Sequence, residues 1–302
     1  MEFQKSLKER VACSGVGLHS GKPVRMVLAP APPGTGIVFR RTDLPKGFEI
    51  KAEWLNVVDT SFATTLGCNG HQVATVEHLL AAIYSLGIDN LVVEIDSGEV
   101  PIMDGSAQEF VLMLQKAGLL LQDEPARYIR LIRPVKVSEG DREAALFPAD
   151  DFQISLVIEY DHPLIGIQSY SAVISQEMFE QEVCRARTFG FLSEVEGLKA
   201  QGLARGGSLG NAVVVGREAI LNQEGLRFPD EFVRHKVLDC LGDLSLFGLP
   251  LKAHYQAYKP GHSLNHKLLG LVLADGRNFI VAESFGLSHR SFHVPLGALA
   301  SG

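Results

Sequence analysis

The 302-residue sequence contains no long hydrophobic run. None of its apolar segments approaches the roughly 20 residues that a helix needs to cross a bilayer. Its first residues, "MEFQKSLKER", also lack the apolar centre of a secretory signal peptide. The sequence therefore predicts a soluble protein without an integral membrane segment, and we expect a cytoplasmic location and a monomer.

Cysteine is scarce: Cys13, Cys68, Cys184 and Cys240 are the only four, and they form no C-x-x-C pair. Such spacing is typical of free thiols in a reducing compartment and excludes a small disulfide framework. The sequence also has no excess of positive charge, since it contains 28 Lys and Arg residues and 35 Asp and Glu residues. The net charge of −7 gives no reason to expect a nucleic-acid partner, so any anionic ligand must be held by a local basic cluster.

Several well-known motifs are absent. The sequence has no H-E-x-x-H, which argues against a zincin peptidase, and no H-x-E with P-C-x-x-C, which argues against a nucleobase deaminase. The segment "GVGLHSG" at 15–21 lacks the spacing of a dinucleotide-binding loop and is better interpreted as a turn at the end of a strand.

The first part of the chain predicts strands followed by helices. Residues 11–40 and 88–96 are rich in Val, Ile and Leu and predict strands. One helix is expected to start at Thr75 as its N-cap, and a second to start with Ser106 and Glu109 as a capping box. The stretch 119–127 changes from apolar to charged around a proline and is a candidate linker.

The same plan recurs after this linker. Residues 128–137 and 152–160 predict strands, residues 176–185 and 230–247 predict helices, and a further short helix follows Gly261. A glycine-rich loop is expected at 202–211. The pattern indicates an α+β fold with two domains and suggests a duplicated unit, although residue identity between the halves is too weak to establish a repeat.

The helix predicted around "FVRHKVLDCLGD" carries an unusual polar stripe. His235, Asp239 and Asp243 are spaced four residues apart and therefore share one side of an α-helix, while Val237 and Leu241 lie on roughly the opposite side. The stripe either faces water or builds a site.

Two further segments carry reactive side chains without an evident packing reason. They are "TVEHLLAA", with Glu77 and His78, and "KPGHSLNHK", with Lys259 and His262. A catalytic zinc takes three ligands and leaves one position for water, and His78, His235 and Asp239 would satisfy that count. Glu77 could then serve as a general base. Taken singly, each segment also suits a plain structural role: a solvated helix face, an acidic first turn, or a turn residue.

Seven segments together resemble one known family. "GVGLHSG", "TVEHLLAA", "VPIMDGSA", "RARTFGF", "GGSLGNAVVV", "LRFPDEFVRHKVLDCLGDL" and "KPGHSLNHKLL" are similar, in order and spacing, to the UDP-3-O-acyl-N-acetylglucosamine deacetylase (LpxC) family of lipid A synthesis. The similarity runs from about residue 3 to 275.

This resemblance implies a zinc hydrolase that removes acetate from the 2-amino group of a UDP-linked, 3-O-acylated glucosamine. It also implies two α+β domains, residues 1–122 and 127–302, each a β-sheet layered against helices. The helical layers would pack face to face with the active site between them. Two alternatives stay open: a module that binds a nucleotide-sugar lipid without catalysis, and a metal-dependent amidase for another acylated sugar.

The resemblance also implies residue roles. His78, His235 and Asp239 would bind Zn²⁺, for which Fe²⁺ or Co²⁺ could substitute. Glu77 would be the general base, Thr188 and His262 would stabilise the oxyanion, and Asp243 would keep His262 charged. Whether Glu77 alone or together with His262 handles both proton transfers stays open.

For the substrate, the resemblance implies that Lys236 contacts the anionic end and that residues of about 191–215 form an apolar passage for the acyl chain. Ordinary core packing is the alternative for the apolar members of this set. The residues expected in this passage are Val195, Leu198, Ala204 and Ser208, and those expected to border it are Phe62, Phe189 and Phe191. Residues after about 285 match no family motif, so no role is assigned to His289 or His293.

Overall fold

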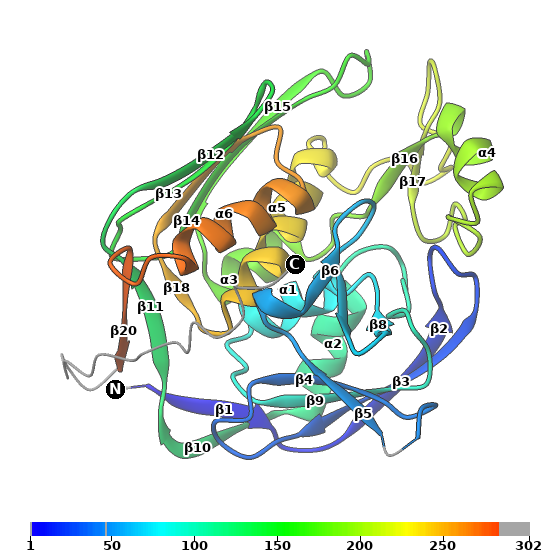
Figure 1. The fold of residues 1–302 in the computed structure, drawn as a ribbon. Helices are drawn as coiled ribbons and strands as arrows, with labels where there is room; N and C mark the ends of the chain where they lie inside the picture. The colour runs from blue at the N-terminus through cyan, green and yellow to red at the C-terminus, as the bar shows by residue number, and fades with distance from the viewer. Residues whose placement is uncertain (1, 46, 284–302) are drawn as a thin grey trace.

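The computed structural model describes residues 2–45 and 47–283, in which helices lie between two five-stranded sheets (Figure 1). The first sheet has the order β2 (Val11–Val16), β3 (Pro23–Pro30), β9 (Leu91–Ile95), β4 (Ile37–Arg41) and β5 (Phe48–Lys51). The second has the order β12 (Val135–Glu139), β13 (Arg142–Phe147), β19 (His254–Tyr258), β14 (Gln153–Glu159) and β15 (Ile167–Val173). This arrangement confirms the predicted α+β class.

The two sheets have the same topology. In each, the third strand in the order pairs antiparallel with the second and parallel with the fourth, and the outer strands pair antiparallel. Each half also has the chain order of four strands, a helix, the central strand and a final helix. The helices are α1 (Glu77–Ser85) and α2 (Gln108–Ala117) in the first half, and α5 (Glu231–Leu244) and α6 (His262–Leu273) in the second. The recurrence that the sequence only suggested is therefore evident in the strand pairing.

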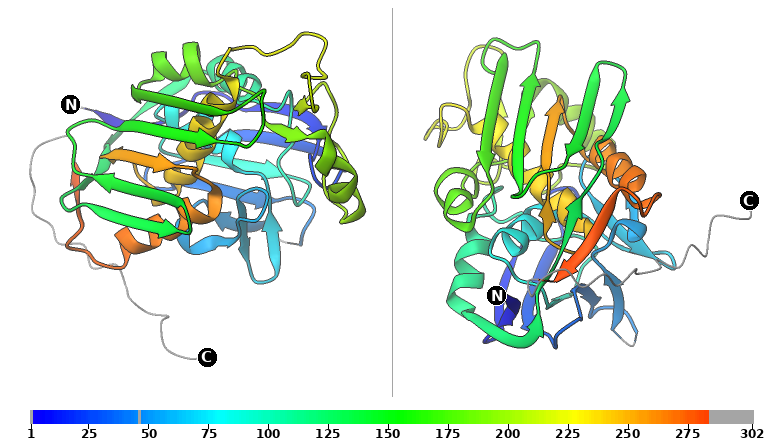
Figure 2. Two further views of the ribbon diagram at one scale, coloured as in Figure 1. Left: turned by 90° about the horizontal axis from the view of Figure 1, so that it is seen from above. Right: turned by 90° about the vertical axis from the view of Figure 1, so that its left-hand side faces the viewer.

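Both halves carry an insertion at the equivalent place, between the fourth strand and the first helix. In the first half it holds η1 (Trp54–Asn56), β6 (Val57–Asp59), β7 (Thr65–Cys68) and β8 (His71–Val73). In the second it holds α3 (Gln176–Met178), the π-helix η2 (Phe179–Val183), β16 (Phe189–Phe191), α4 (Leu192–Ala200) and β17 (Val213–Val215). The part with β16, α4 and β17 extends to one side of the molecule, near β2 (Figures 1 and 2).

The helices of the two halves meet in the centre (Figure 1). α5 packs on β14 and β15, α6 packs on β12 and β13, and α2 packs on β2. α1 lies directly against α5 and also contacts α2. Residues of α1 and α5 therefore come together although more than a hundred positions of the chain separate them.

The stretch predicted as a linker is a strand, so that prediction is wrong. β10 (Leu119–Pro125) pairs antiparallel with β1 (Phe3–Leu7) at the start of the chain. After Pro125 the chain continues at once into β11 (Arg127–Leu131), which lies between β18 (Leu251–Lys252) and β20 (Phe279–Glu283). The domain limits at residues 122 and 127 stay predictions.

Two predicted helix starts also differ. Thr75 is not the N-cap of α1: its φ is +57° and its hydroxyl donates to the Glu99 carboxylate at 3.3 Å, so the helix begins at Glu77. α2 begins at Gln108 after Ala107, without a side-chain cap. The Ser106 hydroxyl is oriented by Asp104 at 2.8 Å rather than by Glu109, so the expected capping box does not form. The turn chemistry of the preceding residues decides both starts.

All residues of α5 except Arg234 and Lys236 are buried. Its apolar residues Val233, Val237 and Leu241 are inaccessible to solvent, but His235, Asp239 and Asp243 are also at most 5% exposed. The polar stripe therefore faces the other half of the protein rather than water. Among residues 2–45 and 47–283, no helix has the length and apolar character needed to cross a membrane. His289 and His293 lie outside the described residues.

Candidate metal centre and active site

The site lies where the first turn of α1 meets the middle of α5. Gly242 makes this approach possible, because a β-carbon there would overlap the backbone of Glu77. An isolated glycine inside a helical pattern costs helix propensity and generally has a packing reason. Here the reason is the contact that brings Glu77 and His78 next to His235 and Asp239.

Three side chains offer ligand atoms to one point. His78, His235 and Asp239 each present one such atom, and these atoms lie within 4.8 Å of one another. Asp239 Oδ1 is 3.5 Å from Nε2 of His78 and 3.3 Å from Nε2 of His235. The imidazole rings of the two histidines are perpendicular, with centroids 5.0 Å apart. The structure thus brings together the three residues predicted as ligands.

The protonation of this cluster suits a cation. Nδ1 of His235 lies 3.1 Å from the Ala186 carbonyl, which accepts only if that nitrogen carries the proton. Burial lowers the pKa of His235 to about 3, so the ring is neutral and its Nε2 presents a lone pair. Burial opposes the charge of Asp239, yet the surrounding positive groups, including Lys236, hold the pKa of Asp239 well below its ordinary value.

An imidazole lone pair therefore faces an ionised carboxylate oxygen at 3.3 Å. Two acceptors at this distance repel each other unless a proton or a metal ion lies between them. Imidazole nitrogen and carboxylate oxygen are ordinary zinc ligands, and a histidine ligand typically donates its other N–H to a carbonyl, as His235 does. The residues present thus fit a divalent metal.

Glu77 is buried beside this cluster. Its Oε2 accepts the backbone N–H of Thr64 at 3.0 Å. Burial raises the pKa of Glu77 above its ordinary value, which makes the carboxylate a stronger base. The position of Glu77 in the first turn of α1 favours its ionised form.

His262, at the start of α6, faces the same space. Its Nδ1 lies 2.9 and 3.1 Å from the two oxygens of Asp243, and the Thr64 hydroxyl donates to Asp243 Oδ1 at 2.6 Å. Burial opposes protonation of His262, but the charge and hydrogen bond of Asp243 outweigh burial and raise the pKa of His262 to about 9. A raised pKa favours the protonated form of His262 at neutral pH, which is the form that the resemblance implies.

Thr188 lies next to the cluster through its chain neighbours. Ala186 accepts the hydrogen bond from His235, and the Phe189 ring is 6.2 Å from the His235 ring. The Thr188 backbone is held by Gly105 at 2.7 Å and Val213 at 2.8 Å. Lys236 lies in the same region, but its ammonium donates to Asp239 Oδ2 at 2.7 Å and sits over Phe189.

The residues expected along the acyl passage fall into separate groups. Phe189 and Phe191 both contact the Tyr160 ring, with centroid distances of 5.7 and 5.8 Å. Phe62 is half exposed and lies near His19 of the first half. Three residues, Val195, Leu198 and Ala204, are partly buried in the second insertion, where Ser208 is exposed.

Sequence reasoning missed three residues of the site. Thr64 contacts both Glu77 and Asp243 from a loop with no distinguishing pattern. Asn265 donates to Asp243 Oδ2 at 2.8 Å, and its spacing of three from His262 on a predicted helix could have revealed it. Gly242 could have been recognised as an unexplained glycine inside the polar stripe.

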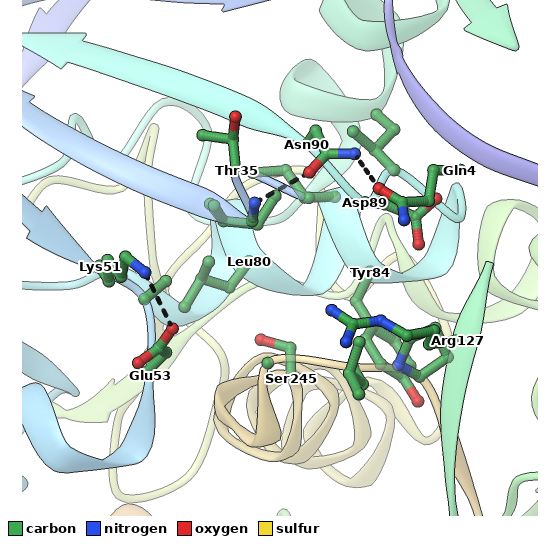
Figure 3. A pocket seen from close by; sticks show the side chains of 18 of the residues that line it. Gln4, Thr35, Lys51, Glu53, Leu80, Tyr84, Asp89, Asn90, Arg127 and Ser245 are labelled. Atoms are coloured by element: carbon green, nitrogen blue, oxygen red, sulfur yellow. Dashed lines mark hydrogen bonds and ion pairs between the residues drawn. The ribbon is translucent and has the colours of Figure 1, made fainter. Parts of the chain in front are cut away.

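A separate pocket of about 250 Å³ lies beside the later turns of α1 (Figure 3). Leu80, Ile83 and Tyr84 of α1 line it, together with Asn90 and Arg127. None of the predicted site residues contributes to its wall. This pocket is therefore distinct from the candidate metal centre, whose assignment depends on side-chain chemistry and not on cavity size.

Comparison with known proteins gives a consistent result. The model of the family described as "UDP-3-O-acyl N-acetylglycosamine deacetylase" (LpxC) matches residues 4–274. A protein of Myxococcus xanthus named UDP-3-O-acyl-N-acetylglucosamine deacetylase is 54% identical over 272 residues, covering 90% of this chain and 87% of the relative. A protein of the same name from Saccharophagus degradans is 49% identical over 300 residues, covering 98% and 99%. A third, from Syntrophus aciditrophicus, is 48% identical over 283 residues, covering 94% and 90%.

The family match spans both sheets and all the residues of the candidate centre. The identity is close to half over nearly the full length of each relative. The chain therefore belongs to the UDP-3-O-acyl-N-acetylglucosamine deacetylase family.

Proposed function

We propose that the protein is a zinc-dependent deacetylase that hydrolyses the N-acetyl group of UDP-3-O-acyl-N-acetylglucosamine to the free amine and acetate, the committed step of lipid A biosynthesis. Family membership supports the substrate. The single structural observation that carries the chemistry is the convergence of His78, His235 and Asp239 beside the buried carboxylate of Glu77. The predictions of a cytoplasmic location and of a monomer stay predictions.

In this proposal His78, His235 and Asp239 hold the metal. Zn²⁺ is the expected ion, and Fe²⁺ or Co²⁺ could occupy the same ligands. When bound, such an ion supplies Lewis acidity: it lowers the pKa of water toward neutrality and polarises a carbonyl group. The Ala186 carbonyl keeps the proton of His235 on Nδ1, so that Nε2 is available as a ligand.

Glu77 is the proposed general base. The Thr64 N–H holds Oε2 at 3.0 Å and thereby orients the carboxylate. The other oxygen can then accept the proton of the water that attacks the acetyl carbonyl carbon. Burial strengthens the base by raising its pKa, which favours proton transfer at neutral pH.

His262 is the proposed acid. Asp243 occupies Nδ1, so the proton on Nε2 is the one that can reach the reacting groups. His262 can stabilise the developing oxyanion with this N–H and then protonate the departing amine. The Thr188 hydroxyl is the second proposed oxyanion donor, positioned by the segment that also holds His235.

The substrate is proposed to lie across both halves. Lys236 offers positive charge near the anionic end, although its ammonium also neutralises Asp239. Phe62, Phe189 and Phe191, with Val195, Leu198, Ala204 and Ser208 of the second insertion, are the residues proposed to border the acyl chain. Acetate release from substrates with different acyl lengths would test this part separately.

The central test combines metal analysis with an acetate-release assay on the wild type and Glu77→Gln. We expect near one zinc per chain in both proteins, and a loss in kcat of about 10²–10⁴ in the variant, because a general base contributes on that order. Wild-type turnover by Glu77→Gln would contradict the role of Glu77. A zinc-loaded wild type that binds the substrate tightly without releasing acetate would instead indicate a binding module.

A further inference from the structure

Two buried polar residues lie behind the acid side of the site and have no part in the chemistry described so far. They are Tyr255 on β19 and Asn265 on α6, both fully inaccessible to solvent. The Tyr255 hydroxyl donates to Asn265 Oδ1 at 2.5 Å, and Asn265 Nδ2 donates to Asp243 Oδ2 at 2.8 Å. Asp243 in turn accepts from His262 Nδ1 at 2.9 Å. A continuous chain of hydrogen bonds thus connects Tyr255 to the proposed acid.

The direction of this chain is determined. Burial raises the pKa of Tyr255 well above its ordinary value, so the phenol keeps its proton and donates a hydrogen bond to Asn265 Oδ1. The Asn265 amide must then turn its oxygen toward Tyr255 and its NH₂ group toward Asp243. The opposite orientation would place two acceptors, the amide oxygen and the carboxylate, against each other. The Asp243 carboxylate therefore fixes the orientation of Asn265, and the Tyr255 hydroxyl satisfies the amide oxygen on the other side.

The donated hydrogen bond affects the charge that His262 experiences. Asp243 accepts from Thr64 on Oδ1 and from Asn265 on Oδ2, and both donors draw on its negative charge. When His262 is neutral, its Nδ1–H still donates to Asp243 beside these two donors. When His262 is protonated, the two donors and the imidazolium share that carboxylate. Each donor therefore favours the neutral form of His262 and lowers the pKa that His262 would have beside an unshared carboxylate.

Other charged groups also face His262. Glu77 of α1 and Asp239 of α5 add negative charge, and together with Asp243 they favour the protonated ring. Arg142 of β13 donates to the Lys259 carbonyl at 3.1 Å and so lies near the loop before α6. Asp243 is the carboxylate that touches the ring, so its charge has the largest influence on the proton affinity of His262.

We propose that Asn265, held in place by Tyr255, is a positioning residue that sets the proton affinity of His262 by sharing the charge of Asp243. This role rests on the proposed function only in taking His262 as the acid. It concerns neither the metal ligands nor the general base. It also explains why two polar residues, a tyrosine and an asparagine, are buried at positions where packing alone would not require polar groups.

The proposal predicts the sign of a change in titration. In Asn265→Leu, which keeps the branching of the side chain but cannot donate, His262 should bind its proton about tenfold more tightly, the usual order for one hydrogen bond to a charged group. The alkaline limb of kcat/KM should move to higher pH, while kcat at neutral pH falls because the acid is weaker. Tyr255→Phe should change both quantities in the same direction and by less.

Matched variants separate this effect from a general disturbance. The double variant Tyr255→Phe/Asn265→Leu removes both polar partners and leaves no orphaned hydroxyl, so it covers the case in which Asn265→Leu alone fails to fold. Cys240→Ala is the control, because Cys240 Sγ contacts both residues but Asn265 and Asp243 remain joined without it. It should lower stability and leave the titration of His262 unchanged.

The decisive measurement is the NMR titration of the His262 imidazole in zinc-loaded protein, with His262→Gln to assign the signal. A midpoint that rises in Asn265→Leu and in the double variant supports the proposal. A midpoint that stays, or falls toward that of an ordinary histidine, overturns it. The titration needs no turnover: absent acetate release with a raised midpoint would refute the proposed function alone, and normal turnover with an unchanged midpoint would refute this inference alone.

Discussion

The carbonyl oxygen of Glu77 lies 2.1 Å from the point that a β-carbon on Gly242 would occupy. α1 and α5 therefore touch through their backbones at the position where the two halves of the protein meet. Because His78 follows Glu77 and Asp239 lies three residues before Gly242, this single contact sets the distance between ligand atoms from opposite halves.

Gly242→Ala should therefore separate α1 from α5. We expect a loss of stability of about 1–3 kcal/mol or more from overpacking, together with weaker zinc binding. Urea unfolding and metal titration would measure these effects. Gly197→Ala is the matched control, since Gly197 also lies in a helix but has no atom within 4 Å of the added carbon. Equal behaviour of the two variants would show that the close contact is unimportant.

Metal removal should destabilise the protein. A ligand that binds only the folded state, at a free concentration a thousand times its Kd, contributes about 4 kcal/mol to stability. We expect a chelator to lower the Tm of the wild type and to leave the Tm of Asp239→Asn nearly unchanged, because that variant loses one ligand. Differential scanning calorimetry with and without chelator measures both. A wild-type Tm that is the same with and without chelator would argue against a metal at His78, His235 and Asp239.

The ion pair of His262 and Asp243 should make stability depend on pH. The pKa of His262 is about 9 in the folded protein and near 6.5 in the unfolded chain. Since the folded value is the higher one, the stabilisation is fully present below about pH 6.5 and disappears as the pH rises through about 9. Urea unfolding measures the free energy of unfolding of the wild type and of His262→Gln across this range. The difference between these two free energies should become smaller as the pH rises. A constant difference would indicate that His262 is not protonated in the folded state.

Arg187 should stabilise the segment that positions His235. Its guanidinium is buried and binds Glu231 at 2.9 Å, Glu224 at 2.6 Å and the Gly225 carbonyl at 2.7 Å. Arg187→Met would leave the fully buried carboxylate of Glu231 without its charge partner, which typically costs 3–5 kcal/mol. Because Ala186 accepts from His235, zinc affinity should fall as well.

Arg277→Met provides the comparison for this variant. Arg277 pairs with Asp275 at 2.7 Å on the surface, where ion pairs contribute little to stability. We expect chemical denaturation to show nearly wild-type behaviour for Arg277→Met. A similar result for Arg187→Met would show that the buried network is dispensable.

Local pattern explains which elements the sequence could predict. The helix at 230–247 corresponds to α5 and η3 (Ser245–Phe247), because apolar residues recur with helical period and the polar stripe has the same period. The proximity of His235 and Asp239 follows from that helix alone. The wrong linker prediction at 119–127 has the opposite origin. β10 is a strand because it pairs with β1, which lies more than a hundred residues away. The local sequence pattern contains no information about such a distant partner.

The sequence by itself determined the α+β class, the helix that places His235 and Asp239 together, and the family, since these depend on periodicity and on motifs read along the chain. Only the tertiary structure decided that the polar stripe is buried, that α1 delivers Glu77 and His78 to it, and that Thr64 reaches Asp243 across 179 positions. The physical reason is that helical spacing is a property of neighbouring residues. Contact between helices depends instead on how two sheets pack around a shared core and on one glycine that lets their backbones touch.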